Sequence, residues 1–468
     1  MKLIAIFSTF TLLFCGAGPF AADRPNILFI AIDDMRDWTG YSGSAQAKTP
    51  NMDRLAKSGV AFTRAYTAYA LCNPSRTALL TGLRPSTTGV ITNGEDWRVA
   101  VPAERPSLPG YLHAQGYRTL GQGKIFHGSK VRQEEWDEYA KDGEREEKDA
   151  DKKDWSLKPG KTPDGFMIGS NDIAPLDSPE EELVDYKTAS FGVAQLGKAH
   201  DRPFFLACGF HRPHLPWNAP HKYFEMFPLE SISLPELKTD DLADLPKEGV
   251  IMAKAGEFAA IRDLNKYREC VRAYLACIAF TDAQVGRLLD ALEKSPHKDS
   301  TIVCLWSDHG WHHGEKEHWR KSTLWEEATR APLIWRVPGM TKPGSVCERP
   351  VDFLGIYPTL CDLAGLPLPP HLQGVSLKPL LADPQAAWEH PAISTMHDGN
   401  HAIRTERWRY IHYANGGEEL YDEQADPHEW TNLAGMPEHA AMKAELAKWL
   451  PADAAPVTAK AKKKKKKP

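Results

Sequence analysis

Four runs of consecutive apolar residues, separated by helical patterns, predict the core of the fold. The runs cover residues 26–32, 204–208, 301–306 and 333–337, and they are rich in β-branched and aromatic side chains. Such runs, without polar alternation, are typical of strands buried on both faces of a sheet. Residues 269–294 carry apolar side chains at helical spacing, which predicts an amphipathic helix. Strands that alternate with helices predict an α/β domain on a large, mostly parallel mixed sheet flanked by helices.

The pattern changes near residue 375. Residues 390–421 contain short strand-like runs with a hairpin turn at Asn415-Gly416-Gly417, and residues 437–450 have helical spacing. These features predict a smaller C-terminal subdomain of antiparallel α+β type. The predicted division is a larger domain over 23–375, the subdomain over 376–452, and a lysine-rich tail over 453–468 that is too charged to fold.

The N-terminus has the layout of a secretory signal peptide. Met1-Lys2 is followed by an apolar stretch over residues 3–14 and by small residues up to Ala22. The stretch is too short to span a bilayer, so residues 1–22 predict export to the periplasm or the medium without stable membrane insertion. Cys15 raises the alternative of a lipid anchor, which the large Phe14 before it disfavours.

Net charge and the spacing of the cysteines reduce the number of protein classes that remain possible. A net charge of -5 over 468 residues gives no reason to expect a nucleic-acid partner. The charged segment 134–155 is interpreted as a solvated loop or surface helix. Removal of the leader leaves seven cysteines, an odd number, and none has the CxxC spacing of a zinc site. Several of them are therefore expected to be free and buried.

Polar residues follow three of the predicted strands. Asp33 and Asp34 follow the first run, Asp308 and His309 follow the third, and a histidine-rich turn at 211–214 follows the second. In open α/β sheets ligands bind beyond the carboxyl ends of the strands. One acid in such a place often only caps a helix, but here acids or histidines follow three separate strands. Three crowded carboxylates repel each other without a cation, and their hard oxygens suit Ca²⁺.

Residues 72–82 (CNPSRTALLTG) predict a capped helix with a cysteine at its start. Asn73 is a good N-cap, Pro74 suits the first turn, and the following leucines begin a buried face. Cys72 would then lie at a helix N-terminus, where free N–H groups favour an anion. Arg76 lies about one turn further on.

This segment resembles the C-x-P-S-R…T-G signature of the sulfatase family. Further motifs of that family match at residues 26–34, 49–56, 121–127 (GQGKIFH), 308–321 and 373–377. The resemblance implies the alkaline-phosphatase-like sulfatase fold. Within the family, the HRPHLP turn at 211–216 and the DHGW segment at 308–311 look closest to iduronate-2-sulfatase and its bacterial relatives. Many other sulfatases have Asn where His309 stands.

The resemblance also implies a cofactor and a maturation partner. A formylglycine-generating enzyme would oxidise Cys72 to Cα-formylglycine, and Ca²⁺ would bind Asp33, Asp34, residue 72 and Asp308. His309 either binds the cation directly or orients Asp308. The hydrated aldehyde would attack sulfur with one hydroxyl, and its second hydroxyl would drive the release of sulfate, which a plain Ser or Cys cannot do.

The same resemblance assigns the remaining roles. Arg76 would hold the hydrate and its loop, and Lys124 and Lys321 would contact the sulfate oxygens. Asp308 would accept the first proton and His127 the second. His214 would protonate the leaving alcohol, with His211 as the alternative. Several further side chains are expected at the rim of the site: His312, His313 and His318, and also Trp217, Trp319 and Arg320 as a platform for a sugar acid.

Three functions stay open at this stage. The first is a sulfatase acting on a sulfated sugar or a polysaccharide such as a glycosaminoglycan, where the iduronate-like motifs suggest a 2-O-sulfated uronic acid. The second is a phosphodiesterase or phosphonate monoester hydrolase on the same scaffold, because some of those enzymes also use formylglycine. The third is a binding protein with an inactive site, which the full set of chemical residues disfavours.

Overall fold

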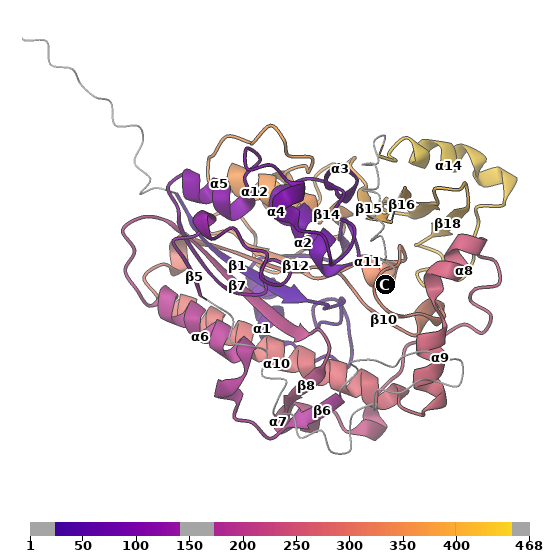
Figure 1. Cartoon of the computed structure of the whole chain (residues 1–468), viewed down its shortest axis with the longest axis horizontal. Coiled ribbons are helices and arrows are strands. Elements are labelled where there is room, and N and C mark those ends of the chain that lie inside the picture. The colour runs from indigo at the N-terminus through magenta and orange to yellow at the C-terminus, as the bar shows by residue number, and fades with distance from the viewer. Residues whose placement is uncertain (1–23, 141–172, 398, 452–468) are drawn as a thin grey trace, which may run out of the picture.

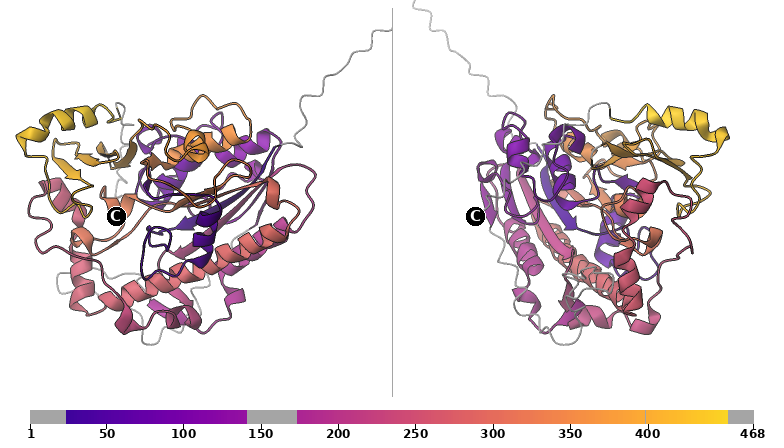
Figure 2. Two further views of the ribbon diagram at one scale, coloured as in Figure 1. Left: turned by 180° about the vertical axis from the view of Figure 1, so that it is seen from behind. Right: turned by 45° about the vertical axis from the view of Figure 1, so that its right-hand side comes forward.

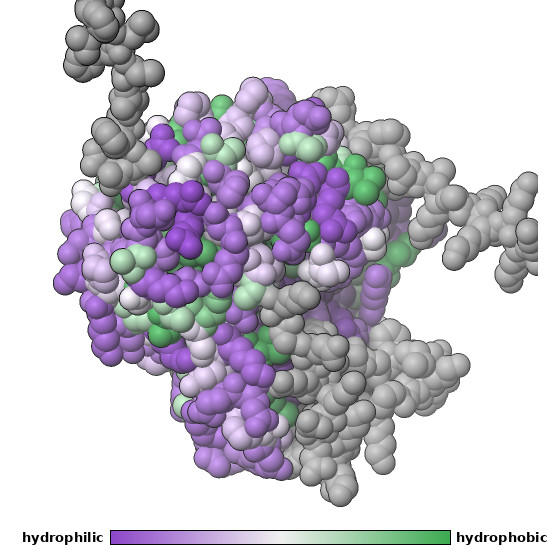
Figure 3. Space-filling model, turned by 60° about the vertical axis from the view of Figure 1, so that its left-hand side comes forward, coloured by the Kyte–Doolittle hydropathy of each residue, from purple (hydrophilic) through white to green (hydrophobic). Residues whose placement is uncertain are grey.

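The computed structural model describes residues 24–140, 173–397 and 399–451. The predicted signal peptide, most of the charged segment 134–155 and the lysine-rich tail lie outside these residues. Among the helices of the described part, none combines the length and the apolar character that crossing a membrane requires. On the face seen in Figure 3, hydrophilic residues predominate and hydrophobic ones are scattered among them.

An eight-stranded mixed sheet forms the centre of the molecule (Figure 1). Its order is β13-β2-β12-β9-β1-β7-β4-β5, and all four predicted apolar runs are strands in it. β1 pairs in parallel with β7 and β9, whereas β12 runs antiparallel to both its neighbours. The strands span β1 Asn26–Asp33, β2 Val60–Phe62, β4 Arg118–Gly123, β5 Glu138–Ala140, β7 Phe204–Pro213, β9 Thr301–Ser307, β12 Leu333–Arg336 and β13 Ser345–Cys347.

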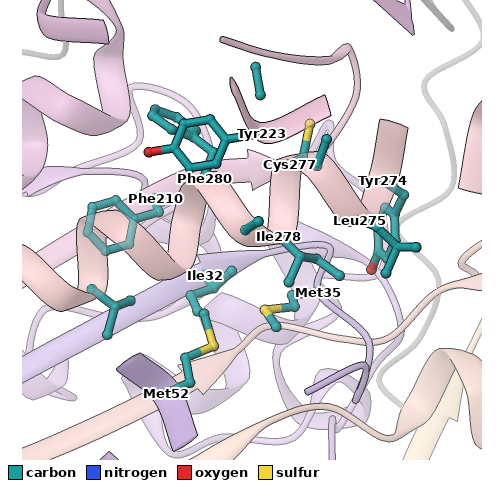
Figure 4. Close-up of a cluster of buried hydrophobic side chains, with 14 of the residues drawn as sticks. Ile32, Met35, Met52, Phe210, Tyr223, Tyr274, Leu275, Cys277, Ile278 and Phe280 are labelled. Carbon is teal, nitrogen blue, oxygen red and sulfur yellow. The ribbon is translucent and has the colours of Figure 1, made fainter. Parts of the chain in front are cut away.

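Helices cover both faces of this sheet, as the continuous apolar runs require. Leu28, Ile30 and Ile32 of β1 face α1 (Pro50–Ser58), α6 (Val184–Leu196) and α10 (Tyr267–Lys294). Figure 4 shows this layer, with Ile32 and Met35 close to Ile278 of α10. The alternate residues of β1 face α2 (Cys72–Thr81), α5 (Leu108–Ala114) and α12 (Ile356–Leu363). The prediction of a helix over 269–294 is confirmed.

A separate antiparallel sheet of four strands follows near the C-terminus, as predicted. Its strands are β15 (Ala392–Met396), β16 (Asn400–Arg404), β17 (Trp408–His412) and β18 (Glu418–Asp422), and the expected hairpin turn joins the last two. α14 (Ala440–Ala447) packs on it, and Figure 2 shows both at one end of the molecule. Buried Arg409 of β17 pairs with Glu326 of α11 (Glu326–Thr329), which ties this sheet to the larger domain.

The start of the charged segment is more ordered than the sequence suggested. Residues 133–135 form a short 3₁₀ helix, and β5 adds an edge strand parallel to β4. Trp136 is buried because its ring packs on Tyr139 and Phe205. The prediction of a solvated loop or surface helix is therefore wrong for Glu135 and Trp136, which are buried, whereas Glu134, Asp137 and Glu138 are exposed as expected.

The seven cysteines after the leader are all free and buried in the structure. Burial raises the pKa of most of these thiols, for example that of Cys208 to about 12. Such thiols act as small apolar side chains. The prediction of free, buried cysteines is confirmed. Cys72 differs from the other six because charged side chains surround its thiol.

Candidate active site

Three carboxylates meet at the carboxyl ends of the central strands. Asp33 ends β1, Asp34 follows it, and Asp308 follows the neighbouring β9, and all three are buried. The Asp34 backbone has a φ of 59°, in the left-handed region that few residues adopt. Its N–H donates to Asp308 Oδ1 at 2.9 Å. The parallel pairing of β1 with β9 therefore produces the predicted convergence.

Cys72 lies beside these acids as the first residue of α2. Its Sγ is 3.5 Å from Asp34 Oδ1. The helix N-terminus is where the sequence predicted it, but Asn73 is not the N-cap. Leu71 holds that position, and the Asn73 amide donates to the carbonyls of Thr92 and Glu95 instead. A loop 20 residues away captures the asparagine side chain, which no local cap rule anticipates.

Arg76 is wholly buried between two of the acids. Its Nε donates to Asp308 Oδ2 at 2.9 Å, and one terminal nitrogen lies 3.2 Å from Asp33 Oδ1. The planar guanidinium can bridge both carboxylates at once, which a lysine cannot do. It also donates to backbone carbonyls of Ile32, Lys124 and Ile125.

Two lysines complete the charge balance. Lys124 follows β4 and its ammonium donates to Asp33. Lys321 Nζ lies 2.5 Å from Asp34 Oδ1 and 3.0 Å from Cys72 Sγ. Both ammonium groups thus face the three acids and residue 72 from different elements. Their positive charges would offset the charge of an anionic group bound at residue 72.

The surrounding charges shift the pKa values of these groups. Burial alone would raise the pKa of the Cys72 thiol, but Lys124, Lys321 and hydrogen bonds from His127 and His214 hold it well below its usual value. Burial raises the pKa of Asp308 to about 7, although Arg76 and His309 oppose this. The pKa of Asp33 is lowered, because Lys124, His214 and Arg76 outweigh its burial and the neighbouring thiol.

The residues fit a divalent cation. The ligand atoms of Asp34, Cys72, Asp308 and His309 all lie within 4.8 Å of one another, as do those of Asp33, Asp34, Cys72 and His214. One buried atom here, Asp34 Oδ2, has no hydrogen-bond partner among the described residues, and His309 Nε2 lies 3.1 Å from the other oxygen of the same carboxylate. Buried polar atoms are normally paired, so Asp34 Oδ2 supports a cation at this place.

The predicted histidines divide into two groups. His127 and His214 both hydrogen-bond the Cys72 side chain, and His214 Nε2 lies 3.7 Å from Asp34 Oδ2. The His211 backbone N–H donates to Asp185 Oδ1, and its carbonyl accepts from the His214 N–H at 2.9 Å. The structure thus brings His127 and His214 together at residue 72, and His211 lies in the turn that holds His214.

The predicted rim is wrong for the other histidines. His312, His313 and His318 are buried rather than exposed, and burial lowers the pKa of each, that of His318 to about 4. His313 packs within a cluster of aromatic rings, stacked on Trp38 at 4.7 Å. The segment folds inward because the His313 ring packs against the rings of Trp38, Tyr274 and Trp319.

The tryptophans of the expected platform are also buried. Trp217 and Trp319 belong to the same aromatic cluster and have almost no exposed surface. Arg320 is partly exposed, and its Nε donates to Glu257 at 2.6 Å. Of the three residues, only Arg320 reaches the surface.

Two residues that support the site were not predicted. Tyr274 of α10 donates its hydroxyl to the Asp34 carbonyl at 2.7 Å and accepts the Arg36 N–H. Ser307 Oγ accepts the Met35 N–H at 3.0 Å. Both fix the strained turn after β1. Tyr274 lies within the predicted amphipathic helix over 269–294, and its hydroxyl is the only feature of the residue that signals a polar role.

Comparison with known families agrees with this arrangement. A model described as Sulfatase matches residues 25–366, which include every site residue above. The chain belongs to the sulfatase family. It is accordingly a sulfuric ester hydrolase, as its curated relatives are. A second model, described as N-sulphoglucosamine sulphohydrolase, C-terminal, matches residues 314–455.

Individual relatives cover most of the chain. A sulfatase from Formosa agariphila is 37% identical over 88% of this chain and 83% of its own length. The mouse iduronate 2-sulfatase is 32% identical over 75% of this chain and 71% of its own length. Among solved structures, a phosphonate monoester hydrolase of Agrobacterium radiobacter has a TM-score of 0.74 at 26% identity, covering 91% of this chain and 94% of that one.

Proposed function

We propose that this sulfatase is exported and removes sulfate from a 2-O-sulfated uronic acid in a sugar or polysaccharide. It would use Ca²⁺ and a formylglycine made from Cys72. The observation that carries this proposal is the position of Cys72, at the N-terminus of α2 between Lys321 and the buried acids. A site with three acids and two lysines around one side chain suits an anionic ester and a cation together.

The cation would be held by Asp33, Asp34 and Asp308, with His309 beside them. Carboxylate oxygens are the ligands that Ca²⁺ prefers, whereas imidazole is a poorer one. His309 Nδ1 contacts the Gly310 carbonyl at 3.0 Å, so its Nε2 faces the acids. Bound calcium would lower the pKa of an oxygen nucleophile and offset the charge of the ester.

Residue 72 would be modified before the chain folds. Cys72 has no exposed surface in the folded structure, so a formylglycine-generating enzyme could reach it only in the unfolded chain. Modification there would supply a hydrated aldehyde with two hydroxyl groups, whereas a plain thiol has no hydroxyl group. Passage of an unfolded chain through an export system fits this order of events.

The chain's own residues would bind the sulfate and move the protons. Lys124 and Lys321 would contact its oxygens, from the positions they hold around Asp33, Asp34 and Cys72. Asp308 would accept the first proton from the residue 72 side chain, and its raised pKa suits that task. His127 would accept the second proton, and His214 Nε2 would protonate the oxygen of the leaving alcohol.

The substrate class is supported by the names of relatives such as the mouse iduronate 2-sulfatase. The mouse enzyme at 32% identity acts, by its name, on iduronate 2-sulfate. A panel of defined sulfated disaccharides tests the assignment. We expect release of sulfate from a 2-O-sulfated uronic acid at the non-reducing end. Faster release from 6-O- or N-sulfated glucosamine under the same conditions would refute this choice while leaving a sulfatase.

A phosphonate monoester hydrolase is the second candidate, because a solved structure of that activity shares the fold at 26% identity. The two functions differ in the ester that is cleaved. Rates on 4-nitrophenyl sulfate and on a 4-nitrophenyl phosphonate monoester distinguish them. We expect the sulfate to be hydrolysed faster, and a higher kcat/KM on the phosphonate would favour the alternative.

A further inference from the structure

The segment that carries Lys321 has an unusual backbone. Four of its residues, Lys316, Glu317, Arg320 and Ser322, have φ angles of 54°, 49°, 89° and 73°. Residues other than glycine rarely adopt these angles, and they persist only where surrounding contacts hold them. The contacts that hold this segment therefore determine where the Lys321 ammonium lies.

His318 lies at the centre of those contacts. It is buried, and its two ring nitrogens meet two different backbone carbonyls. Nδ1 meets the carbonyl of Ala253, the last residue of α8 (Lys247–Ala253), and Nε2 meets the carbonyl of Lys321 at 2.9 Å. Carbonyl oxygens only accept hydrogen bonds, so a ring N–H has to donate to each bond that forms. The end of a helix also leaves its last carbonyls without helical partners, and the Ala253 carbonyl that Nδ1 faces is one of them.

The Lys321 carbonyl is held close to the reacting residue. Ser322 N–H donates to the Ala70 carbonyl at 2.9 Å, so the backbone on the far side of Lys321 is fixed beside α2. His318 fixes the near side. Between these two bonds, the Lys321 side chain extends to Asp34 and to Cys72 Sγ at 3.0 Å. A shift of the carbonyl would move the ammonium from both groups.

We infer that His318 is a positioning residue that places Lys321 for sulfate binding by donating Nε2–H to the Lys321 carbonyl. The inference rests on the proposed role of Lys321 at the sulfate. Both ring nitrogens of His318 face backbone carbonyls, so His318 acts on the sulfate through Lys321 and not by direct contact. Burial lowers the pKa of His318 to about 4, so the ring is neutral and carries a single N–H. On Nε2 this N–H sets the geometry of the site, whereas on Nδ1 it would hold the end of α8 instead. The nitrogen that carries the N–H therefore determines which carbonyl His318 holds.

Two substitutions distinguish these two cases. The amide nitrogen of glutamine lies near the place of Nε2, so His318→Gln keeps a donor for Lys321. The amide nitrogen of asparagine lies near the place of Nδ1, so His318→Asn keeps only the donor for Ala253. His318→Leu removes the donor at similar volume. His401→Gln is the matched control, because His401 is also buried and bonded, to Thr395 of the C-terminal sheet.

The readouts are kcat and KM on 4-nitrophenyl sulfate, the inhibition constant of inorganic sulfate, and the melting temperature. We expect His318→Asn and His318→Leu to lose about 100-fold in kcat, the loss typical of a misplaced catalytic group. Their inhibition constants for sulfate should rise. His318→Gln should keep most of the wild-type kcat and sulfate inhibition, and His401→Gln should change neither.

Equal losses in the Asn and Gln variants, or an Asn variant with wild-type kcat, would overturn the inference. The Leu variant reports folding, because a drop in melting temperature without a change in sulfate binding would show a structural role alone. If the wild type hydrolyses no sulfate ester, the proposed function fails. The role of His318 is then tested separately by calorimetry of sulfate binding. His318→Gln should bind sulfate more tightly than His318→Asn. A wild type that binds no sulfate would overturn both.

Discussion

Replacement of Arg76 by leucine removes a guanidinium that bridges Asp33 and Asp308. All three side chains are buried, and the N–O distances are 2.9 Å to Asp308 and 3.2 Å to Asp33. Breaking a buried ion pair costs about 3–5 kcal/mol, because the remaining charge has no partner. At an unfolding entropy of about 2 cal/mol/K per residue over roughly 400 residues, this lowers the Tm by about 4–6 °C.

Differential scanning calorimetry of the chelated protein measures this change. The matched control is Arg118→Leu, because the Arg118 side chain is 42% exposed and 3.5 Å from the exposed Asp201 carboxylate. Its expected shift is below about 1 °C. We also expect added Ca²⁺ to raise the Tm of Arg76→Leu more than that of the wild type, because a cation then replaces the lost charge. A Tm for Arg76→Leu within 1 °C of the wild type, matching the control, would refute the buried bridge.

Three further predictions follow from the same structure. Lys321→Ala should lower kcat on 4-nitrophenyl sulfate by about 10²–10³-fold, the usual cost of one lost transition-state contact, in a steady-state assay. Asp34→Asn should weaken Ca²⁺ binding in titration calorimetry, whereas an unchanged affinity would place the cation elsewhere. Burial raises the pKa of Asp282 to about 6, so the folded state binds its proton more tightly than the unfolded state does. Stability should therefore fall as the pH rises from about 4 to 6, by about 3 kcal/mol, and Asp282→Asn should flatten that part of a plot of Tm against pH.

The parts of the fold that were predictable depend on strong local patterns. Each continuous apolar run is a strand, because a strand covered on both faces needs apolar residues at every position. The convergence of Asp33, Asp34 and Asp308 followed from one rule, that parallel strands end at the same edge of a sheet. The antiparallel pairing of β12 was not predictable, because its apolar run is the same in either direction.

The errors arose where distant contacts outweigh local preference. Asn73 has the right residue type for an N-cap, but its amide is satisfied by a loop that the helix packs against. His313 and Trp319 were expected at the surface because they follow an active-site motif. They are buried because their rings pack in the aromatic cluster around Tyr274. A segment as short as this has no hydrophobic periodicity from which its burial could be predicted.

The central claim is that a modified Cys72, rather than its thiol, carries the activity. Mass spectrometry of the peptide 65–76, released by trypsin from active protein, measures it most directly alongside the specific activity on 4-nitrophenyl sulfate. The account predicts an aldehyde at residue 72 whose fraction rises in proportion to the specific activity across preparations. Full activity in material that carries only the unmodified thiol would contradict it.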